Sequence, residues 1–287
     1  MPTHPARHDA LTPALLASLV LFIVSERTHA QATEAPPTTP PAPSPAAHTT
    51  PKSFQQEVPG AAFAFTMVLI PGDDAKGIKP FYIATTELTW PAFDPFVYRL
   101  DDPSAAPAGQ AGADATTRPS KPYLPPDRGF GHDGYAAISM SFHSAEMYCK
   151  WLSEKSGLIY RLPTEAEWAH AAGGTNALPA DAALTDFAWF NKNADGKPHP
   201  VATKAANAHG LHDMLGNVQE WCVGADGKPV TKGGSYRDPA ERLTTTHRAP
   251  FSSAWNASDP QMPKSKWWLA DGPFVGFRVV CEAPEIP

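Results

Sequence analysis

The sequence predicts an α+β fold in which a small sheet and a few packed helices are joined by long, ordered loops. Three observations support this class. Stretches with helical or strand periodicity are few and short, and irregular chain dominates between them. In residues 210–221, apolar side chains of the kind found in cores are interleaved with turn residues. Bound cations would stabilise loops of this kind.

The first 30 of the 287 residues have the pattern of a secretory signal peptide. Arg7 precedes an apolar run at residues 11–24, and Thr-His-Ala at residues 28–30 resembles a small-residue cleavage site. An uncleaved membrane anchor is the alternative, but a span needs about 20 apolar residues and this run is shorter. We therefore expect an exported protein, secreted or periplasmic, with no membrane span after cleavage.

Composition divides the remaining chain. Residues 31–60 are rich in proline and predict an extended, disordered linker. Residues 61–287 are expected to form one domain. Within it, residues 101–134 are rich in Pro, Ala, Gly and Asp and have no apolar periodicity, which predicts an insertion in a surface loop.

The charge excludes some classes of partner. The formal net charge is −6 and the pI is near 6.0, with no stripe of Lys or Arg, so we expect neither nucleic acid nor an anionic membrane surface as a partner. Motifs of serine hydrolases, P-loop nucleotide-binding proteins and His-Glu-x-x-His zinc enzymes do not occur. We expect a monomer whose partner is an exported protein, a peptide or a glycan.

The domain begins with two predicted strands, at residues 63–71 and 80–84, bounded by glycine turns. Thr89 is a candidate cap for the helix that follows, in which Pro91 suits the first turn and Pro95 should bend the axis. The buried face of this helix is predicted from four apolar residues at helical spacing: Phe93, Phe96, Val97 and Leu100.

Two further helices have clear termini. Ser141 or Ser144 caps the first, which Gly157 ends, and its apolar stripe consists of Ala145, Tyr148, Cys149 and Leu152. After a short predicted strand at residues 158–162, Thr164 and Glu167 fit a capping box for the second, with Gly173 at its C terminus. Trp168 and Ala172 are predicted to pack on the core.

The segment at residues 210–221, Gly-Leu-His-Asp-Met-Leu-Gly-Asn-Val-Gln-Glu-Trp, mixes anchoring apolar residues, turn residues and acids. Because Gly216 and Asn217 interrupt regular structure, backbone carbonyls are left inside the fold and need partners. A calcium ion held by carbonyls and Glu220 is one answer, and a buried turn satisfied by protein donors and water is the other. Residues 274–281 predict a buried closing strand.

Several of these segments together resemble one family. Glu-Leu-Thr at residues 87–89, Arg-Leu-Pro-Thr-Glu-Ala-Glu-Trp at 161–168, Gly-Asn-Val-Gln-Glu-Trp at 216–221, Gly-Gly-Ser at 233–235 and Gly-Phe-Arg at 276–278 occur in the order seen in formylglycine-generating enzymes, also called sulfatase-modifying factors. The resemblance implies a compact α+β domain distantly like C-type lectins, with little regular secondary structure.

The resemblance also raises a difficulty for the reaction. Enzymes of this family oxidise a cysteine of a sulfatase to formylglycine with copper(I), which two cysteines after Gly-Gly-Ser hold, and thiolates suit that soft ion. Here Asp238 and Leu243 stand in place of those cysteines, and no Cys lies between Cys222 and Cys281. The copper-dependent mechanism is therefore not expected.

Other positions carry over by resemblance. A calcium loop is implied at Leu215, Gly216, Val218 and Glu220, and a second, looser one at Asn191, Asn193 and Asp195. A simple Asn/Asp turn is the alternative for the second. The implied substrate groove is lined by Trp221, Ser235 and Arg248. Cys149 corresponds to a family half-cystine, which implies a Cys149–Cys281 disulfide and leaves Cys222 free.

Two functions follow as hypotheses. One is a divergent metal-dependent oxidase acting on a peptide or thiol, in which Asp238, His247 or His212 holds another redox metal such as iron. The other is a non-catalytic, lectin-like module, in which the aromatic run at residues 255–269 lines a groove for a peptide or glycan. The plain alternative for Trp267 and Trp268 in that run is a buried pair that supports a loop.

Overall fold

The computed structural model describes residues 52–102, 118–120, 122–173 and 183–283. The predicted signal peptide, most of the predicted linker and part of the predicted insertion lie outside these ranges. Strand β1 (Ser53–Glu57) falls within the segment assigned to the linker and pairs with β2, so the folded part begins earlier than predicted. Among the described residues, no helix is long and apolar enough to cross a membrane.

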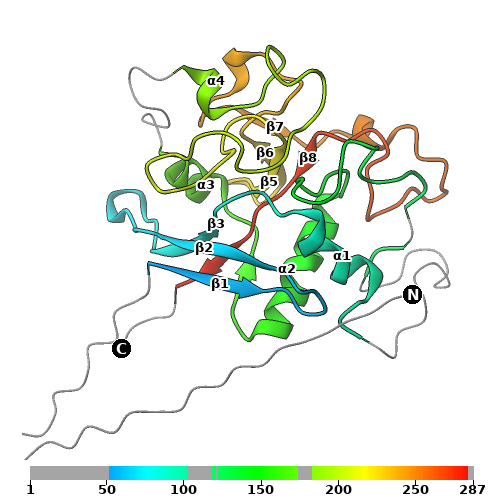
Figure 1. Ribbon diagram of the computed structural model, residues 1–287, viewed down its shortest axis with the longest axis horizontal. Coiled ribbons are helices and arrows are strands. Elements are labelled where there is room, and N and C mark those ends of the chain that lie inside the picture. Colours follow the sequence, from blue (N-terminus) through cyan, green and yellow to red (C-terminus); the bar gives the residue numbers. More distant parts are fainter. Residues whose placement is uncertain (1–51, 103–117, 121, 174–182, 284–287) are drawn as a thin grey trace, which may run out of the picture. The chain divides into compact units, whose positions relative to one another are not determined.

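The first sheet has five antiparallel strands in the order β1-β2-β3-β9-β4 (Figure 1). After β1 come β2 (Ala64–Ile70) and β3 (Phe81–Ala84), which confirm the two predicted strands. Only Tyr160–Arg161 of the strand predicted at residues 158–162 is extended, as β4. Strand β9 (Val280–Glu282), near the end of the chain, lies between β3 and β4 and joins the three N-terminal strands to β4.

The second sheet has four strands in the order β7-β6-β5-β8. Strands β5 (Gln219–Val223), β6 (Pro229–Lys232) and β7 (Arg248–Pro250) are antiparallel, whereas β8 (Val275–Gly276) is parallel to β5. The prediction of a single closing strand at residues 274–281 is therefore wrong. The chain leaves one sheet after β8 and enters the other at β9, because Phe277 and Arg278 turn inward between the two strands.

The helices α1 (Trp90–Tyr98), α2 (Phe142–Ser156) and α3 (Glu165–Ala171) confirm the three predicted helices, and a short α4 (Leu184–Phe187) follows. The Ser141 side chain caps α2, Gly157 ends it in the left-handed conformation, and α3 has the predicted capping box. Two predictions about α1 are wrong. Thr89 makes no side-chain cap, and Leu100 lies past the end of the helix with 55% of its surface exposed.

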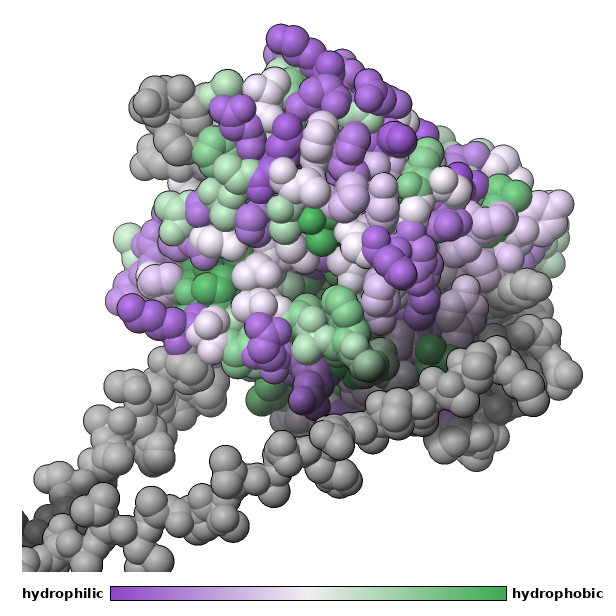
Figure 2. Space-filling view, viewed as in Figure 1, coloured by the Kyte–Doolittle hydropathy of each residue, from purple (hydrophilic) through white to green (hydrophobic). Residues whose placement is uncertain are grey.

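Strand β3, at the centre of the first sheet, is buried on both faces. Successive residues of β3 alternate between two apolar clusters, with Tyr82 and Ala84 in one and Phe81 and Ile83 in the other. This follows from the two-residue period of a strand. It also explains why β3 is a continuous apolar run rather than an alternating pattern. The surface in Figure 2 is mainly polar on the face shown, with apolar residues in small separate groups.

Candidate functional site

A buried ion pair lies where the segment at residues 210–221 enters β5. Glu220 and Arg278 are both fully buried. Arg278 donates from Nη2 to Glu220 Oε1 (2.7 Å) and from Nε to Oε2 (2.8 Å), and Trp168 Nε1 donates to Oε2 (2.7 Å). The guanidinium also donates to the carbonyls of Ala84 and His212. Arg278 thus ties both sheets and the preceding loop to one carboxylate.

Two more buried acids, Glu87 and Asp213, lie near this pair. The charge of the Arg278 guanidinium therefore acts on three carboxyl groups, although it bonds only to Glu220. Glu87 Oε1 accepts from Asn217 Nδ2 (3.0 Å), and Asp213 Oδ2 accepts from the Ala202 amide (2.7 Å). Their other oxygens, Glu87 Oε2 and Asp213 Oδ1, have no hydrogen-bond partner within the described ranges. Burial, together with the charges of Asp213 and Glu220, raises the pKa of Glu87 well above its ordinary value. The protonated form of Glu87 is therefore favoured relative to an exposed glutamate.

Replacing Glu87 by Gln is expected to stabilise the protein at about pH 8 and to change little at about pH 5. In the wild type, the pKa of Glu87 is higher in the folded protein than in the unfolded chain. The contribution of Glu87 to stability is therefore fully present below the ordinary pKa of 4.5 and is lost as the pH rises through the folded pKa. Gln carries no such titration and keeps the acceptor for Asn217. Urea denaturation at both pH values measures the effect. Parallel stability curves for the two proteins would contradict it.

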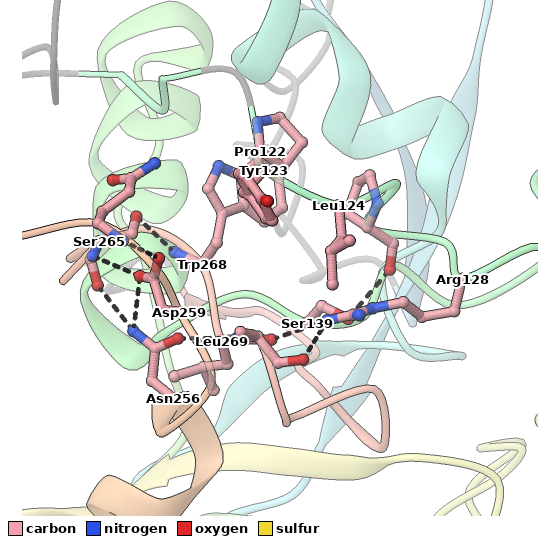
Figure 3. Close-up of a pocket in the computed structure, with 13 residues that line it drawn as sticks. Pro122, Tyr123, Leu124, Arg128, Ser139, Asn256, Asp259, Ser265, Trp268 and Leu269 are labelled. Atoms are coloured by element: carbon pink, nitrogen blue, oxygen red, sulfur yellow. Dashed lines mark hydrogen bonds between the residues drawn. The ribbon is translucent and has the colours of Figure 1, made fainter.

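A pocket opens on another part of the domain, between residues 122–128 and residues 256–270 (Figure 3). Its apolar wall includes Trp268 and Leu269, which are buried, and Tyr123 and Leu124, which are 69% and 40% exposed. Arg128 reaches under this wall toward Ser139. The pocket thus combines aromatic and aliphatic surface with a guanidinium.

Hydrogen bonds within the loop at residues 256–270 hold the pocket in shape. Asp259 accepts from the Ser265 amide (2.7 Å), the Gln261 amide (3.0 Å) and Asn256 Nδ2 (3.2 Å). Asn256 Oδ1 accepts from the Ala270 amide (2.8 Å). Both side chains are nearly fully buried. They build the loop and leave little hydrogen-bonding capacity for a ligand.

Residues 58–283 match the family model described as a sulfatase-modifying factor enzyme 1-like domain. The chain belongs to this family. It is 33% identical to the chaperone protein LppX of Paenibacillus barcinonensis over 143 residues, which are 42% of this chain and 49% of that protein. It is 36% identical to the formylglycine-generating enzyme of Mycobacterium tuberculosis over 104 residues, or 31% of this chain and 33% of that enzyme.

Solved structures support the fold of this sulfatase-modifying factor-like domain. Treponema denticola variable protein 1 superimposes with a TM-score of 0.55 at 21% identity, covering 81% of this chain and 100% of that chain. At this identity the likeness concerns the fold alone. The two curated relatives above are matched over half of their own length or less. The fold predicted from the motifs is confirmed.

The residues predicted to line a substrate groove do not form one. Trp221 and Ser235 are both fully buried. Trp221 donates from Nε1 to the Met140 carbonyl (3.1 Å) and belongs to the core. Arg248 is exposed and pairs with Glu165 at 3.0 Å. The prediction is corrected on this point: the first two are structural, because each is enclosed by packing on every side.

Asp238 and Leu243, the positions predicted to replace the copper-binding cysteines, also have structural roles. Asp238 accepts from the amide and hydroxyl of Ser235 (2.9 and 2.8 Å) and from Gln219 Nε2 (3.2 Å), and it pairs with Arg242. Leu243 is buried in an apolar cluster. Of the predicted alternative ligands, His212 uses Nδ1 to contact the Lys204 carbonyl at 2.8 Å. In the part of the chain that the structure describes, no three His, Cys, Asp or Glu side chains converge as a metal site.

The two predicted calcium loops differ in what their side chains already bind. In the first, Leu215, Gly216 and Val218 place their backbone inside the fold, as predicted. The carboxylate of Glu220, however, is occupied by the Arg278 guanidinium, and a second cation beside it would be repelled. Calcium at this loop stays a prediction.

The second predicted loop has the geometry of an Asn/Asp turn. Asn193 accepts from the Phe190 amide (2.9 Å) and donates to the Ala188 carbonyl (3.0 Å). Asn191 and Asp195 are exposed, and Asp195 has a left-handed φ of 52°. Asn193 therefore closes a turn, and calcium here also remains a prediction.

The three cysteines are free thiols and buried, so the Cys149–Cys281 disulfide implied by the resemblance is absent from the structure. Burial raises the pKa of Cys149 and Cys222 well above the ordinary value, and it raises that of Cys281 to about 11. These thiols are protonated at neutral pH. Such thiols are poor nucleophiles and poor metal ligands.

The sequence reasoning missed half of the pocket. Tyr123, Leu124 and Arg128 lie in the segment interpreted as a surface insertion, where the proline-rich composition carries no periodic signal. The aromatic run at residues 255–269 was a better guide. Trp268 lines the pocket, while Trp267 is fully buried in the core. The plain interpretation therefore fits Trp267, whereas a ligand groove beside Trp268 stays a prediction.

Proposed function

We propose that this sulfatase-modifying factor-like domain is a non-catalytic module that binds a peptide in the pocket beside Trp268. The observation that carries the proposal is the pocket itself, with its exposed Tyr123 and Leu124 beside a rigid, hydrogen-bonded loop. Pre-formed pockets with an apolar lining and a few polar groups are typical of small-ligand sites. We also propose that the protein is exported, on the strength of the signal-peptide pattern in residues 1–30.

A peptide is favoured over a glycan because the polar side chains of the pocket are already hydrogen-bonded within the protein. Recognition of a sugar needs several free donors and acceptors to replace the water around its hydroxyl groups. The side chains of Asn256 and Asp259 are already bonded within their own loop. The apolar wall, in contrast, is partly exposed and suits an aliphatic or aromatic side chain.

The divergent-oxidase hypothesis is the competing function, and the names of relatives such as the formylglycine-generating enzyme favour it. We do not favour this hypothesis. Asp238, which is predicted to stand where the family has a copper-binding cysteine, is buried and hydrogen-bonded to Ser235 and Gln219. A ligand to a redox metal would have to break these bonds first.

Oxygen uptake tests the two functions against each other. The purified protein is mixed with a cysteine-containing peptide and either copper(I) or iron(II), and dissolved oxygen is followed with an electrode. We expect the same rate as in controls with metal and peptide but no protein. Uptake that requires the protein and that is lost in His247→Gln or Asp238→Asn would establish the oxidase instead.

A further inference from the structure

Arg128 is a half-buried cation that forms no ion pair with any residue the structure describes. Its Nη2 donates to the carbonyls of Ala270 (2.6 Å) and Leu269 (3.2 Å), and its Nε donates to Ser139 Oγ (3.4 Å). All of these acceptors are neutral. Among the described residues it forms no salt bridge, unlike Arg118, whose guanidinium meets a carboxylate at 2.6 Å. Nη1 of Arg128 has no hydrogen bond within the same ranges.

The backbone that presents Arg128 is held in an unfavourable conformation. Arg128 has φ 57° and Ser139, which receives its Nε–H, has φ 67°. Left-handed φ values are uncommon for residues other than glycine, and they persist only where the surroundings impose them. Here Ser139 Oγ donates to the Pro126 carbonyl (3.0 Å) and closes the loop around the guanidinium. The side chain is thus positioned before any ligand arrives.

The nearby acids do not contact the Arg128 guanidinium directly. In Figure 3, Asp259 lies with Asn256 and Ser265 on one side of Leu269, whereas Arg128 lies with Ser139 on the other. Asp271, which also influences Arg128 electrostatically, binds the hydroxyl and amide of Ser258 (2.6 and 2.7 Å). An anion from outside is the missing partner. A carboxylate suits it, since its oxygens match the guanidinium fork.

The apolar wall sets what accompanies the carboxylate. The Trp268 indole is fixed by a hydrogen bond from Nε1 to the Ser120 carbonyl (2.8 Å), with Tyr123 and Leu124 beside it. The pocket is small, which favours the end of a chain over a chain that passes through. A peptide C terminus has both features, a carboxylate and a last side chain on neighbouring atoms.

We infer that this pocket binds the C-terminal carboxylate of a peptide whose last residue is apolar, with Arg128 as the carboxylate anchor and Tyr123, Leu124 and Trp268 as the side-chain wall. This inference rests on the proposed peptide-binding function. Capture of a chain-terminal carboxylate is a general mode of peptide recognition, and it gives specificity for chain ends. The partner is then a protein or peptide with a free, apolar C terminus.

An NMR titration with matched ligands tests the anchor. The probes are the tripeptide acetyl-Gly-Gly-Leu as the free acid and the same tripeptide as its C-terminal amide. We expect the acid to bind the wild-type protein about tenfold or more tightly than the amide, because a charge-assisted hydrogen bond is lost in the amide. In Arg128→Gln the two affinities should become equal, and Arg128→Lys should keep part of the preference.

Two control variants and one competing ligand complete the design. Tyr123→Ala, at an exposed site, should weaken both tripeptides, whereas Lys192→Gln, at an exposed lysine outside the pocket, should change neither. Equal binding of acid and amide to the wild type overturns the anchor and leaves peptide binding intact. Failure of both tripeptides to bind overturns the proposed function as well. Binding of sodium glucuronate without either tripeptide would show an acidic-sugar site and overturn both.

Discussion

Replacing Arg278 by Met is expected to lower the free energy of unfolding by about 3–5 kcal/mol, or to prevent folding altogether. The guanidinium is fully buried, and it compensates Glu220 while Glu87 and Asp213 lie beside it. Without it, Glu220 would be left in the core without its ion-pair partner and would lose two of its three hydrogen bonds. Urea denaturation followed by circular dichroism measures the change.

A matched arginine provides the control for this experiment. Arg242 also pairs with an acid, Asp238, but its side chain is 60% exposed. Arg242→Met is therefore expected to cost no more than about 1 kcal/mol, as for other surface pairs. A double variant, Arg278→Met with Glu220→Leu, should recover part of the lost stability, because replacing both members of a buried pair by apolar residues is often tolerated. Equal effects of the two single Met variants would contradict the central role of Arg278.

Replacing Asp101 by Asn is expected to cost about 2–3 kcal/mol near neutral pH. Its carboxylate is 2% exposed and accepts from both terminal nitrogens of Arg118 (2.6 and 2.8 Å) and from Trp151 Nε1 (3.0 Å), and it pairs with Lys155 (2.9 Å). Arg118 also stacks near the Trp151 ring. Asp101, the first residue of the predicted insertion, thus fastens its own segment to Arg118 within the insertion and to α2.

The pH dependence gives this prediction a second measurement. Burial acts to raise the pKa of Asp101, but hydrogen bonds from Arg118, Trp151 and Lys155 outweigh it and hold the pKa well below the ordinary value of 3.8. The stabilisation is therefore present above that value and decreases as the pH falls toward the folded pKa. The difference between wild type and Asp101→Asn should shrink at about pH 3. Asp73→Asn, in an exposed pair with Lys76, should leave the denaturation midpoint unchanged.

Local sequence signals predicted the helices well and the last strands badly. The caps of α2 and α3 depend on residues three or four positions apart, so Ser141, Thr164 and Glu167 predict them directly. The apolar run at residues 274–281 has no such local signal for where one strand ends. Its division between two sheets depends on Arg278 reaching Glu220, which lies 58 positions earlier in the chain.

The candidate site was predicted less completely than the fold. The sequence identified Trp268 within an aromatic run but assigned Trp221 and Ser235 to an open groove, because residue type does not state which way a side chain faces. Arg128 could not be predicted as a pocket residue. Its environment is made by Ser139, Leu269 and Ala270, which approach it only in the folded chain.

By itself, the sequence determined the family, the α+β class and the three main helices. These depend on local motifs and on residue identity. The tertiary structure alone decided that Glu220 faces Arg278, that Asp238 is held by Ser235, and that Arg128 lies in a pocket where neutral groups accept its hydrogen bonds. The physical reason is the same in each case: the chemistry of a charged side chain depends on its partners and burial, which distant segments supply.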